Sequence, residues 1–399
     1  MRQLRRSDSR REPDAITYAD TEKRMTSNVR TLHQGRWQSV VDLATDYCET
    51  KKLPCIAIAT GTSHRIDGLL HVGQQQPNGP APLRDDAIFL VASITKPVVC
   101  MGVMLLIERG HFTLVDRVVD FIPEFGRNGK YGTEIRHLLT HTSGLPDMLP
   151  DNVDLRKVHA TLKLFVERTC EESPTFPPGR GVQYQSMGIA VLGEIITRVT
   201  GKTCAQFLHD EFFRPLNMSE TSLGAPDDWF EGSTPMIDRI PEAILLEEQT
   251  SGTDWTWNSR YWRQLGAPWG GLLTTVTDLS KFAQLMIRLG STAEGQRLLS
   301  PATIGTATRN QLECMRDIPE YDRRCRPWGL GWRLDWPAHS SNFGDLLGPR
   351  AYGHWGATGT LLWIDPDAGT FAMILTTLPQ DHSGKYLCRL SNAVVAAWE

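Results

Sequence analysis

Apolar and polar positions follow two different spacings in the first third of the chain. Residues 35–52 carry apolar side chains three and four positions apart, which predicts an amphipathic helix. Residues 53–60 and 68–73 are short, β-rich runs separated by a polar turn, a pattern typical of adjacent antiparallel strands. From Ser93 the spacing becomes helical again, and we expect this helix to end at Gly110, a residue type that favours helix C-termini.

The rest of the chain changes pattern twice. Residues 120 to about 265 are mostly helix and loop, with helical spacing punctuated by glycine and proline. Strand-like runs return after residue 328, and a closing helix is predicted from about Lys385 to Trp398. Residues 225–269 show no clear period, which is typical of a functional or disordered loop. This stretch holds six large aromatic residues: Trp229, Trp255, Trp257, Tyr261, Trp262 and Trp269.

This order of elements predicts a mixed α/β (α+β) fold in two lobes. An antiparallel β-sheet is built from both ends of the chain and flanked by the N- and C-terminal helices, and an all-helical lobe is inserted between its halves. We assign residues 29–120 and 266–399 to the α/β lobe and residues 121–265 to the helical lobe, with a cleft between them. Residues 1–28 are polar and charged, and we expect them to form a disordered tail.

Composition excludes several classes of function. The 399 residues are 40% hydrophobic with a net charge of −4, and their basic residues are scattered, so no nucleic-acid surface is predicted. No apolar run reaches the roughly 18 residues of a membrane span, and the N-terminus lacks the apolar segment of a secretion signal, so we expect a cytoplasmic protein. The cysteines form no C-x-x-C pair, and a disulfide between Cys314 and Cys325 is open only to an exported chain.

Ser93 and Lys96 are the first candidates for chemistry. Their spacing of three on a helix brings side chains within roughly 5 to 6 Å, so an uncharged lysine can take the serine proton. Pro97 fits only the first helical turn and therefore places Ser93 at the helix N-terminus, where backbone N–H groups favour developing negative charge. Taken alone, the pair is more often an N-cap serine followed by a solvated lysine.

A second candidate element is the Pro- and Gly-rich loop that contains Tyr184 and Ser186, just before a helix. Loops of this kind place polar groups in clefts. A tyrosine beside a lysine ammonium can have its pKa lowered enough to act as general base, or it can relay protons between nucleophile and leaving group. The simpler interpretation is a tyrosine packed at the edge of the loop.

The third element is the stretch GHWGATG, with His354, Gly356 and Ala357 at a predicted edge strand. A glycine lets the substrate backbone approach the strand, and the N–H of Ala357 can join that of Ser93 as an oxyanion pair. Each such donor contributes on the order of 10² to 10³ in rate. A plain β-bulge is the alternative interpretation of the glycine-rich run.

Together these stretches resemble the serine β-lactamase and penicillin-binding protein superfamily. The similarity is greatest to its class C-like branch, which contains family VIII carboxylesterases, transesterases and D-aminopeptidases. It runs from about residue 35 to the C-terminus, in family order. The segments that carry it include ERGHFTLVDRVVDFIPEF, IRHLLTHTSGLPD, YQSMGIAVLGEIITRVTGK, FFRPLNMSET, WGGLLTTVTDLSKFAQLM and YGHWGATGTLLWIDPDAG.

The resemblance implies a role for each motif. Ser93 becomes the acylated nucleophile, Lys96 its base partner, and Tyr184 the base that activates the serine or the deacylating water. His354 takes the place of the basic residue in the third motif, and the strand residues that follow it bind the acyl group. The implied fold is the family's α/β sandwich with a helical lobe, which agrees with the order of elements.

Two departures from the lactam-cleaving pattern affect the choice of substrate. Ser186 stands where those members have asparagine, so it offers no amide to a lactam side chain. His354 and Trp355 replace Lys-Thr, which removes the fixed cation that grips the drug carboxylate. Both departures resemble the esterase and peptidase-like branch, and no segment matches the deacylating glutamate loop of class A enzymes.

We therefore expect a serine hydrolase that cleaves a small ester, amide or lactam through an acyl-enzyme, most simply a carboxylesterase. The alternatives are a β-lactamase or D-alanyl-D-alanine peptidase, an acyltransferase, or a non-catalytic binding member of the fold. No metal or organic cofactor is required. His137 and His141 have the spacing of a metal pair, but no glutamate follows in the required pattern, and we interpret them, like Asp116 and Asp147, as structural.

Overall fold

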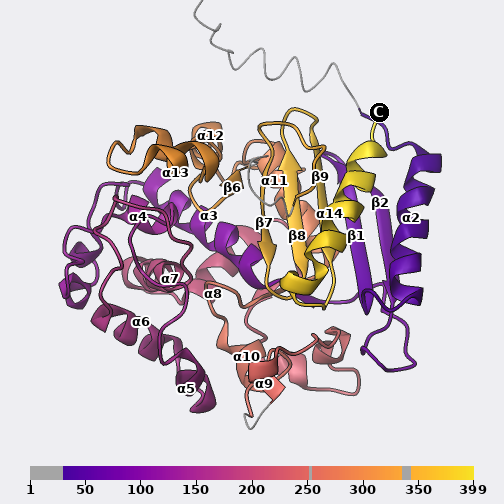
Figure 1. The fold of residues 1–399 in the computed structure, drawn as a ribbon, viewed down its shortest axis with the longest axis horizontal. Coiled ribbons are helices and arrows are strands. Elements are labelled where there is room, and N and C mark those ends of the chain that lie inside the picture. Colours follow the sequence, from indigo (N-terminus) through magenta and orange to yellow (C-terminus); the bar gives the residue numbers. More distant parts are fainter. Residues whose placement is uncertain (1–29, 251–253, 335–342) are drawn as a thin grey trace, which may run out of the picture.

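A computed structural model describes residues 30–250, 254–334 and 343–399 (Figure 1). The predicted tail, residues 1–28, lies outside the described residues. Six strands form one sheet in the order β2-β1-β9-β8-β7-β6, and every neighbouring pair is antiparallel. These strands are β1 (Cys55–Thr62), β2 (Ile66–Gly73), β6 (Arg333–Leu334), β7 (Tyr352–Gly356), β8 (Thr360–Asp365) and β9 (Thr370–Leu375).

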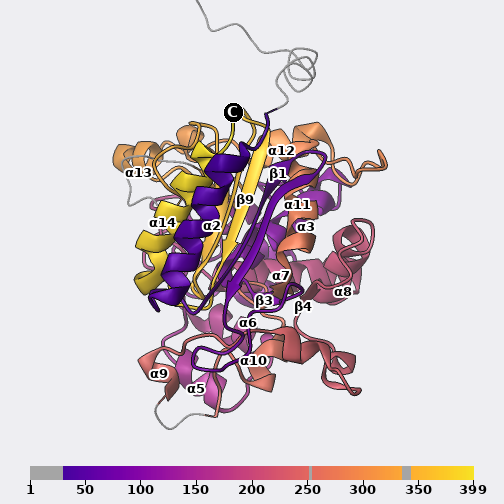
Figure 2. The ribbon, with the colours of Figure 1, turned by 90° about the vertical axis from the view of Figure 1, so that its right-hand side faces the viewer.

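Helices cover both faces of this sheet (Figure 2). The terminal helices α2 (Gln34–Glu49) and α14 (Gln380–Ala396) pack together on one face, and α11 (Val276–Ile287) packs on β1 and β9 from the other. Successive side chains of a strand point to opposite faces, so Ile56 and Ile58 of β1 join the core under the terminal helices, whereas Ala57 and Ala59 join the main core. The sheet therefore separates two hydrophobic cores.

The helix-rich part of the chain packs beside the sheet (Figure 1). At its centre α7 (Met187–Thr200) contacts α3 (Thr95–Glu108), and α7 ends at Gly201, whose left-handed φ of 71° suits a glycine cap. A small sheet joins the two parts in the order β3-β5-β4: β3 (Phe89–Leu90), β4 (Ser222–Leu223) and β5 (Leu272–Thr274). The other α-helices are α4 (Ile135–Leu139), α5 (Asn152–Lys157), α6 (Leu162–Glu171), α8 (Cys204–Leu208), α9 (Glu247–Thr250), α10 (Arg260–Leu265), α12 (Pro301–Ala307) and α13 (Glu320–Cys325).

The structure shows the environment of the aromatic residues in the stretch 225–269 and the state of two cysteines. Five of its six rings are buried in the hydrophobic core, so the stretch packs the protein interior. Cys314 and Cys325 are free thiols. Over the described ranges, no helix is both long and apolar enough to cross a membrane.

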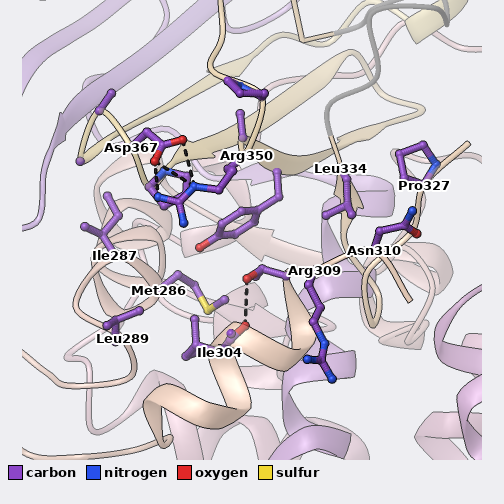
Figure 3. A pocket seen from close by; sticks show the side chains of 18 of the residues that line it. Met286, Ile287, Leu289, Ile304, Arg309, Asn310, Pro327, Leu334, Arg350 and Asp367 are labelled. Carbon is purple, nitrogen blue, oxygen red and sulfur yellow. Dashed lines mark hydrogen bonds and ion pairs between the residues drawn. The ribbon is translucent and has the colours of Figure 1, made fainter. Parts of the chain in front are cut away.

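A cavity of about 1320 Å³ lies where the β1–β2 and β8–β9 turns meet α11 and α12 (Figure 3). Met286 and Ile304 supply part of an apolar wall, and Arg350 lies at its rim, where its Nε donates to Asp367 at 2.9 and 3.0 Å. Its lining includes Tyr352, the first residue of β7, but none of Ser93, Lys96, Tyr184 and His354. This cavity is therefore separate from the candidate active site.

Candidate active site

Ser93 lies in a tight turn that connects β3 to α3. The turn is a single 3₁₀ turn, Ala92–Ile94, and Ala92 has a φ of 46°, a left-handed conformation that is rare for a residue with a Cβ. Thr95 stabilises this turn because its Oγ1 donates to the Ala92 carbonyl at 2.6 Å and accepts from Leu272 N–H of β5 at 3.0 Å. Strained backbone held this firmly is typical of functional sites.

Lys96 is fully buried and points at the nucleophile. Its Nζ donates to Ser93 Oγ at 2.9 Å and to the carbonyl of Trp269 at 2.9 Å. Burial lowers the pKa of Lys96 from its ordinary value of 10.5 to about 7, although the charge of Asp147 acts to raise it. A substantial fraction of Lys96 is therefore uncharged near neutral pH and carries a lone pair that can accept the Ser93 proton.

Tyr184 lies over the same pair. Its ring centroid is 4.8 Å from Lys96 Nζ, and burial raises the pKa of its phenol far above the ordinary value, aided by Asp147 and opposed by hydrogen bonding to Ser93. The sequence-based expectation of a lowered Tyr184 pKa is therefore wrong in direction, because desolvation outweighs the neighbouring cation. A phenol that keeps its proton is suited to donate it, and the buried Lys96 is the better base.

Ser186 is turned toward the protein. Its Oγ donates to Asp147 Oδ1 at 2.6 Å, and its backbone N–H donates to the Asp147 carbonyl at 3.2 Å. Ser186 is 1% exposed. In this geometry Ser186 holds Asp147 beside Lys96. A contact between Ser186 and the substrate stays a prediction.

His354 lies in the site as a neutral ring. It is fully buried, and its Nδ1 is 2.7 Å from the carbonyl of Trp355, so Nδ1 carries the proton because a carbonyl only accepts. Burial lowers the pKa of His354 well below its usual range, reinforced by the charges of Arg333 and Lys96. His354 therefore supplies no fixed positive charge, as the departure from Lys-Thr in the sequence indicates.

Gly356 and Ala357 bring the end of β7 against the nucleophile turn. A Cβ on Gly356 would lie 2.3 Å from the Val91 carbonyl oxygen and 3.1 Å from the Ala92 Cβ, so this glycine is required by the protein's own close packing. Ala357 is exposed at the end of the strand. Among the described residues, neither the Ser93 nor the Ala357 amide donates a backbone hydrogen bond, so both are available to an oxyanion.

Arg333, which the sequence patterns did not single out, also lies at the site. The Arg333 guanidinium lies 3.5 Å from the ring centroid of Trp355, 4.7 Å from that of Trp328 and 5.5 Å from that of Tyr184. Burial lowers the pKa of Arg333 to about 9. Arg333 stands in a predicted strand, and no local spacing links it to the other motifs, so only the folded sheet could reveal it.

His137 and His141, which have the spacing of a metal pair, accept hydrogen bonds from backbone N–H groups. His137 Nδ1 accepts from the Glu134 N–H at 3.0 Å, and His141 Nδ1 accepts from the Gln185 N–H at 3.1 Å. Within the part of the chain that the structure describes, no group of three or more His, Cys, Asp or Glu side chains is arranged to hold a metal ion. His137 thus caps its own helix, and His141 holds a segment 44 residues further along the chain.

A comparison with family models decides the family. The beta-lactamase model matches residues 38–396, nearly the whole chain. The chain belongs to the beta-lactamase family. This finding confirms the resemblance, the fold class and the serine-hydrolase class that the sequence predicts.

Relatives of this beta-lactamase family member include both a penicillin-binding protein and an esterase. Penicillin-binding protein 4 of Amycolatopsis lactamdurans is 28% identical over 355 residues, which cover 85% of this chain and 84% of the relative. Esterase EstB of Burkholderia gladioli is 33% identical over 185 residues, 42% of this chain and 46% of the esterase. A crystal structure of a family VIII carboxylesterase superposes with a TM-score of 0.73 at 21% identity over 92% of this chain and 98% of its own, which bears on the fold alone.

The pH dependence of this site follows from Lys96. Because burial lowers its pKa to about 7, Lys96 is charged and unable to accept a proton below that pH, and it becomes an effective base above it. We expect kcat/KM for an ester to rise with pH through about 7 and to level off above, when initial rates are measured in a constant-ionic-strength buffer series. A profile that is flat or falling through this range would show that Lys96 is not the base.

Proposed function

We propose that this protein is a carboxylesterase-like serine hydrolase that forms an acyl-enzyme on Ser93. The observation that carries the proposal is the 2.9 Å hydrogen bond between Ser93 Oγ and the Nζ of a fully buried Lys96 whose pKa is lowered to about 7. That combination is what a serine needs to become a nucleophile at neutral pH. The catalytic roles of these residues are predictions that the experiments below test.

The proposed reaction proceeds in two halves. Lys96 accepts the Ser93 proton as Oγ attacks the ester carbonyl, and the amide N–H groups of Ser93 and Ala357 stabilise the oxyanion. Tyr184, which keeps its proton in the resting site, donates it to the departing alkoxide and is reprotonated from Lys96. Water, or another acceptor, then attacks the acyl-enzyme with the same groups acting in reverse.

The choice of ester over lactam rests on the third motif. His354 is neutral and buried, so the site has no lysine ammonium at the position where lactam-cleaving members hold the drug carboxylate. The esterase relative from Burkholderia gladioli supports the same choice. Peptidase activity is the second candidate, because the Amycolatopsis penicillin-binding protein matches most of both chains. A cytoplasmic location stays a prediction, and we propose no oligomeric state.

Substrate comparison tests the proposal directly. Wild-type protein and Ser93→Ala are assayed with nitrophenyl esters of increasing acyl length, with nitrocefin, and with a D-alanyl-D-alanine peptide. Ester turnover that depends on Ser93 and exceeds nitrocefin and peptide turnover is the expected result. If the peptide or nitrocefin is the better substrate by kcat/KM, the esterase assignment is wrong, although the acyl-enzyme mechanism stands.

A further inference from the structure

His141 accepts hydrogen bonds from the backbone on both sides of Tyr184. Its carbonyl oxygen accepts from the Gln183 N–H at 2.9 Å, and its ring Nδ1 accepts from the Gln185 N–H at 3.1 Å. One residue thus fixes the two amides that flank the tyrosine. To do so, His141 adopts a left-handed φ of 59°, a conformation that few residues with a Cβ adopt.

The ring of His141 also supports the Tyr184 ring. The His141 and Tyr184 ring centroids are 4.9 Å apart at 37°, and the Trp328 ring packs edge-on against the imidazole with the centroids 4.2 Å apart. His141 is fully buried, and burial lowers its pKa well below the usual range, so the imidazole is neutral. Because the imidazole is enclosed on all sides, it cannot move toward solvent, and its contact with the Tyr184 ring restricts the motion of that ring.

The segment after Tyr184 is anchored by a second set of contacts. The Gln185 side chain accepts from Ser143 Oγ, and its Nε2 donates to the carbonyls of His137 and Leu138 at 3.3 and 3.1 Å. These contacts hold residue 185 to the end of α4 without touching the Tyr184 ring. His141 is the member of this network that contacts both the backbone beside Tyr184 and its ring.

We propose that His141 is a positioning residue that holds the Tyr184 phenol where it can protonate the leaving group. The inference rests on the proposed function, because it assigns a consequence to the Tyr184 role in ester cleavage. A misplaced phenol fails to protonate a poor leaving group such as an alkoxide, whereas a nitrophenolate departs without a proton. Loss of His141 therefore slows alkyl esters more than nitrophenyl esters of the same acid.

The experiment compares the ethyl and nitrophenyl esters of one carboxylic acid. His141→Gly removes the ring and Nδ1 yet tolerates the left-handed φ, and His141→Asn also tolerates it and places a carbonyl oxygen where Nδ1 accepts the Gln185 N–H. His137→Asn is the matched control, since His137 also accepts a backbone N–H through Nδ1 but makes no ring contact with Tyr184. Thermal unfolding and circular dichroism are measured for all variants.

We expect His141→Gly to lower kcat for the ethyl ester by about 100-fold with little change in KM, and to affect the nitrophenyl ester much less. His141→Asn recovers most of the lost rate, and His137→Asn matches wild type on both esters. If His141→Gly does not fold, the same selective loss, smaller in size, is expected of His141→Asn. If the folded His141 variants lose activity equally on the two esters, or lose none, the positioning role is wrong, and turnover by the wild type still upholds the proposed function. If the wild type is inactive on the two esters, the positioning role and the proposed function are both wrong.

Discussion

Replacing Ser93 by alanine is expected to abolish ester turnover. Removal of a nucleophile that works together with a base lowers kcat on the order of 10⁶-fold, because the remaining groups have nothing to activate. The fold should be unaffected, since Ser93 is partly exposed and its Oγ hydrogen-bonds only within the site, to Lys96 and Tyr184. The measurement is kcat/KM on the best nitrophenyl ester, with thermal unfolding as the control.

A second expectation for the same variant follows from Lys96. Without the serine hydroxyl, Lys96 Nζ keeps only its hydrogen bond to the Trp269 carbonyl. Ser93→Ala should therefore also remove the rise of activity through pH 7, leaving only a background rate with no such rise. Residual turnover above one-hundredth of wild type, with the wild-type pH profile, would mean that another residue is the nucleophile.

Replacing Lys96 by methionine is expected to inactivate the enzyme and stabilise it. General-base catalysis contributes about 10² to 10⁴ in rate, so kcat/KM should fall by at least that factor. The stability gain follows from the pKa, which is 10.5 ordinarily and about 7 in the folded protein. The unfolded chain therefore binds the proton more tightly, and the charged lysine costs about 5 kcal/mol of folding free energy below pH 7.

The expected sign of this stability effect can be checked against pH. Between pH 7 and 10.5 the wild type gains stability as pH rises, because unfolding takes up a proton that the folded state does not hold. Methionine leaves the Trp269 carbonyl without its donor, which costs about 1 to 3 kcal/mol, so we expect a net gain of about 3 kcal/mol near pH 6 that disappears toward pH 10. Urea unfolding at both values is the measurement. A Lys96→Met variant less stable than wild type at pH 6 would show that Lys96 is not charged at a cost in the folded state.

Much of the fold could be predicted because its signals are local. The two β-rich runs and the polar turn between them give the hairpin of β1 and β2, and the apolar run after Ser93 gives α3 with Ser93 and Lys96 in adjacent turns. The helix α11, which closes the main core against β1 and β9, was not predicted as an element, although its sequence forms part of the family resemblance. Its apolar residues recur at helical spacing, so the periodicity of this segment could have indicated the helix.

The chemistry of the site depended on contacts that no local pattern contains. Lys96 owes its lowered pKa to complete burial and its position to the carbonyl of Trp269, 173 residues further along the chain. The direction of the Tyr184 pKa was wrong in the sequence-based expectation, because the sequence shows a nearby lysine but not the loss of solvent around the phenol. Motifs thus locate the candidate groups, and packing sets their protonation.

The same distinction applies to the motif that departs from the lactam-cleaving pattern. The sequence shows that a histidine replaces lysine, and the structure shows that this histidine is neutral and donates to the Trp355 carbonyl. Arg333, buried against Trp355 and Trp328, is a charge beside His354 that the sequence did not indicate. We therefore expect a histidine and an arginine here to bind a substrate differently from a lysine ammonium.

The most direct test of an activated serine is intact mass after exposure to a fluorophosphonate probe, followed by peptide mapping, on wild type and Ser93→Ala side by side. This measurement requires no knowledge of the substrate. The account predicts one adduct on wild type, located on Ser93, faster to form above pH 7 than below it, and absent from the variant. Folded wild-type protein without an adduct, or with an adduct that persists in Ser93→Ala, would contradict it.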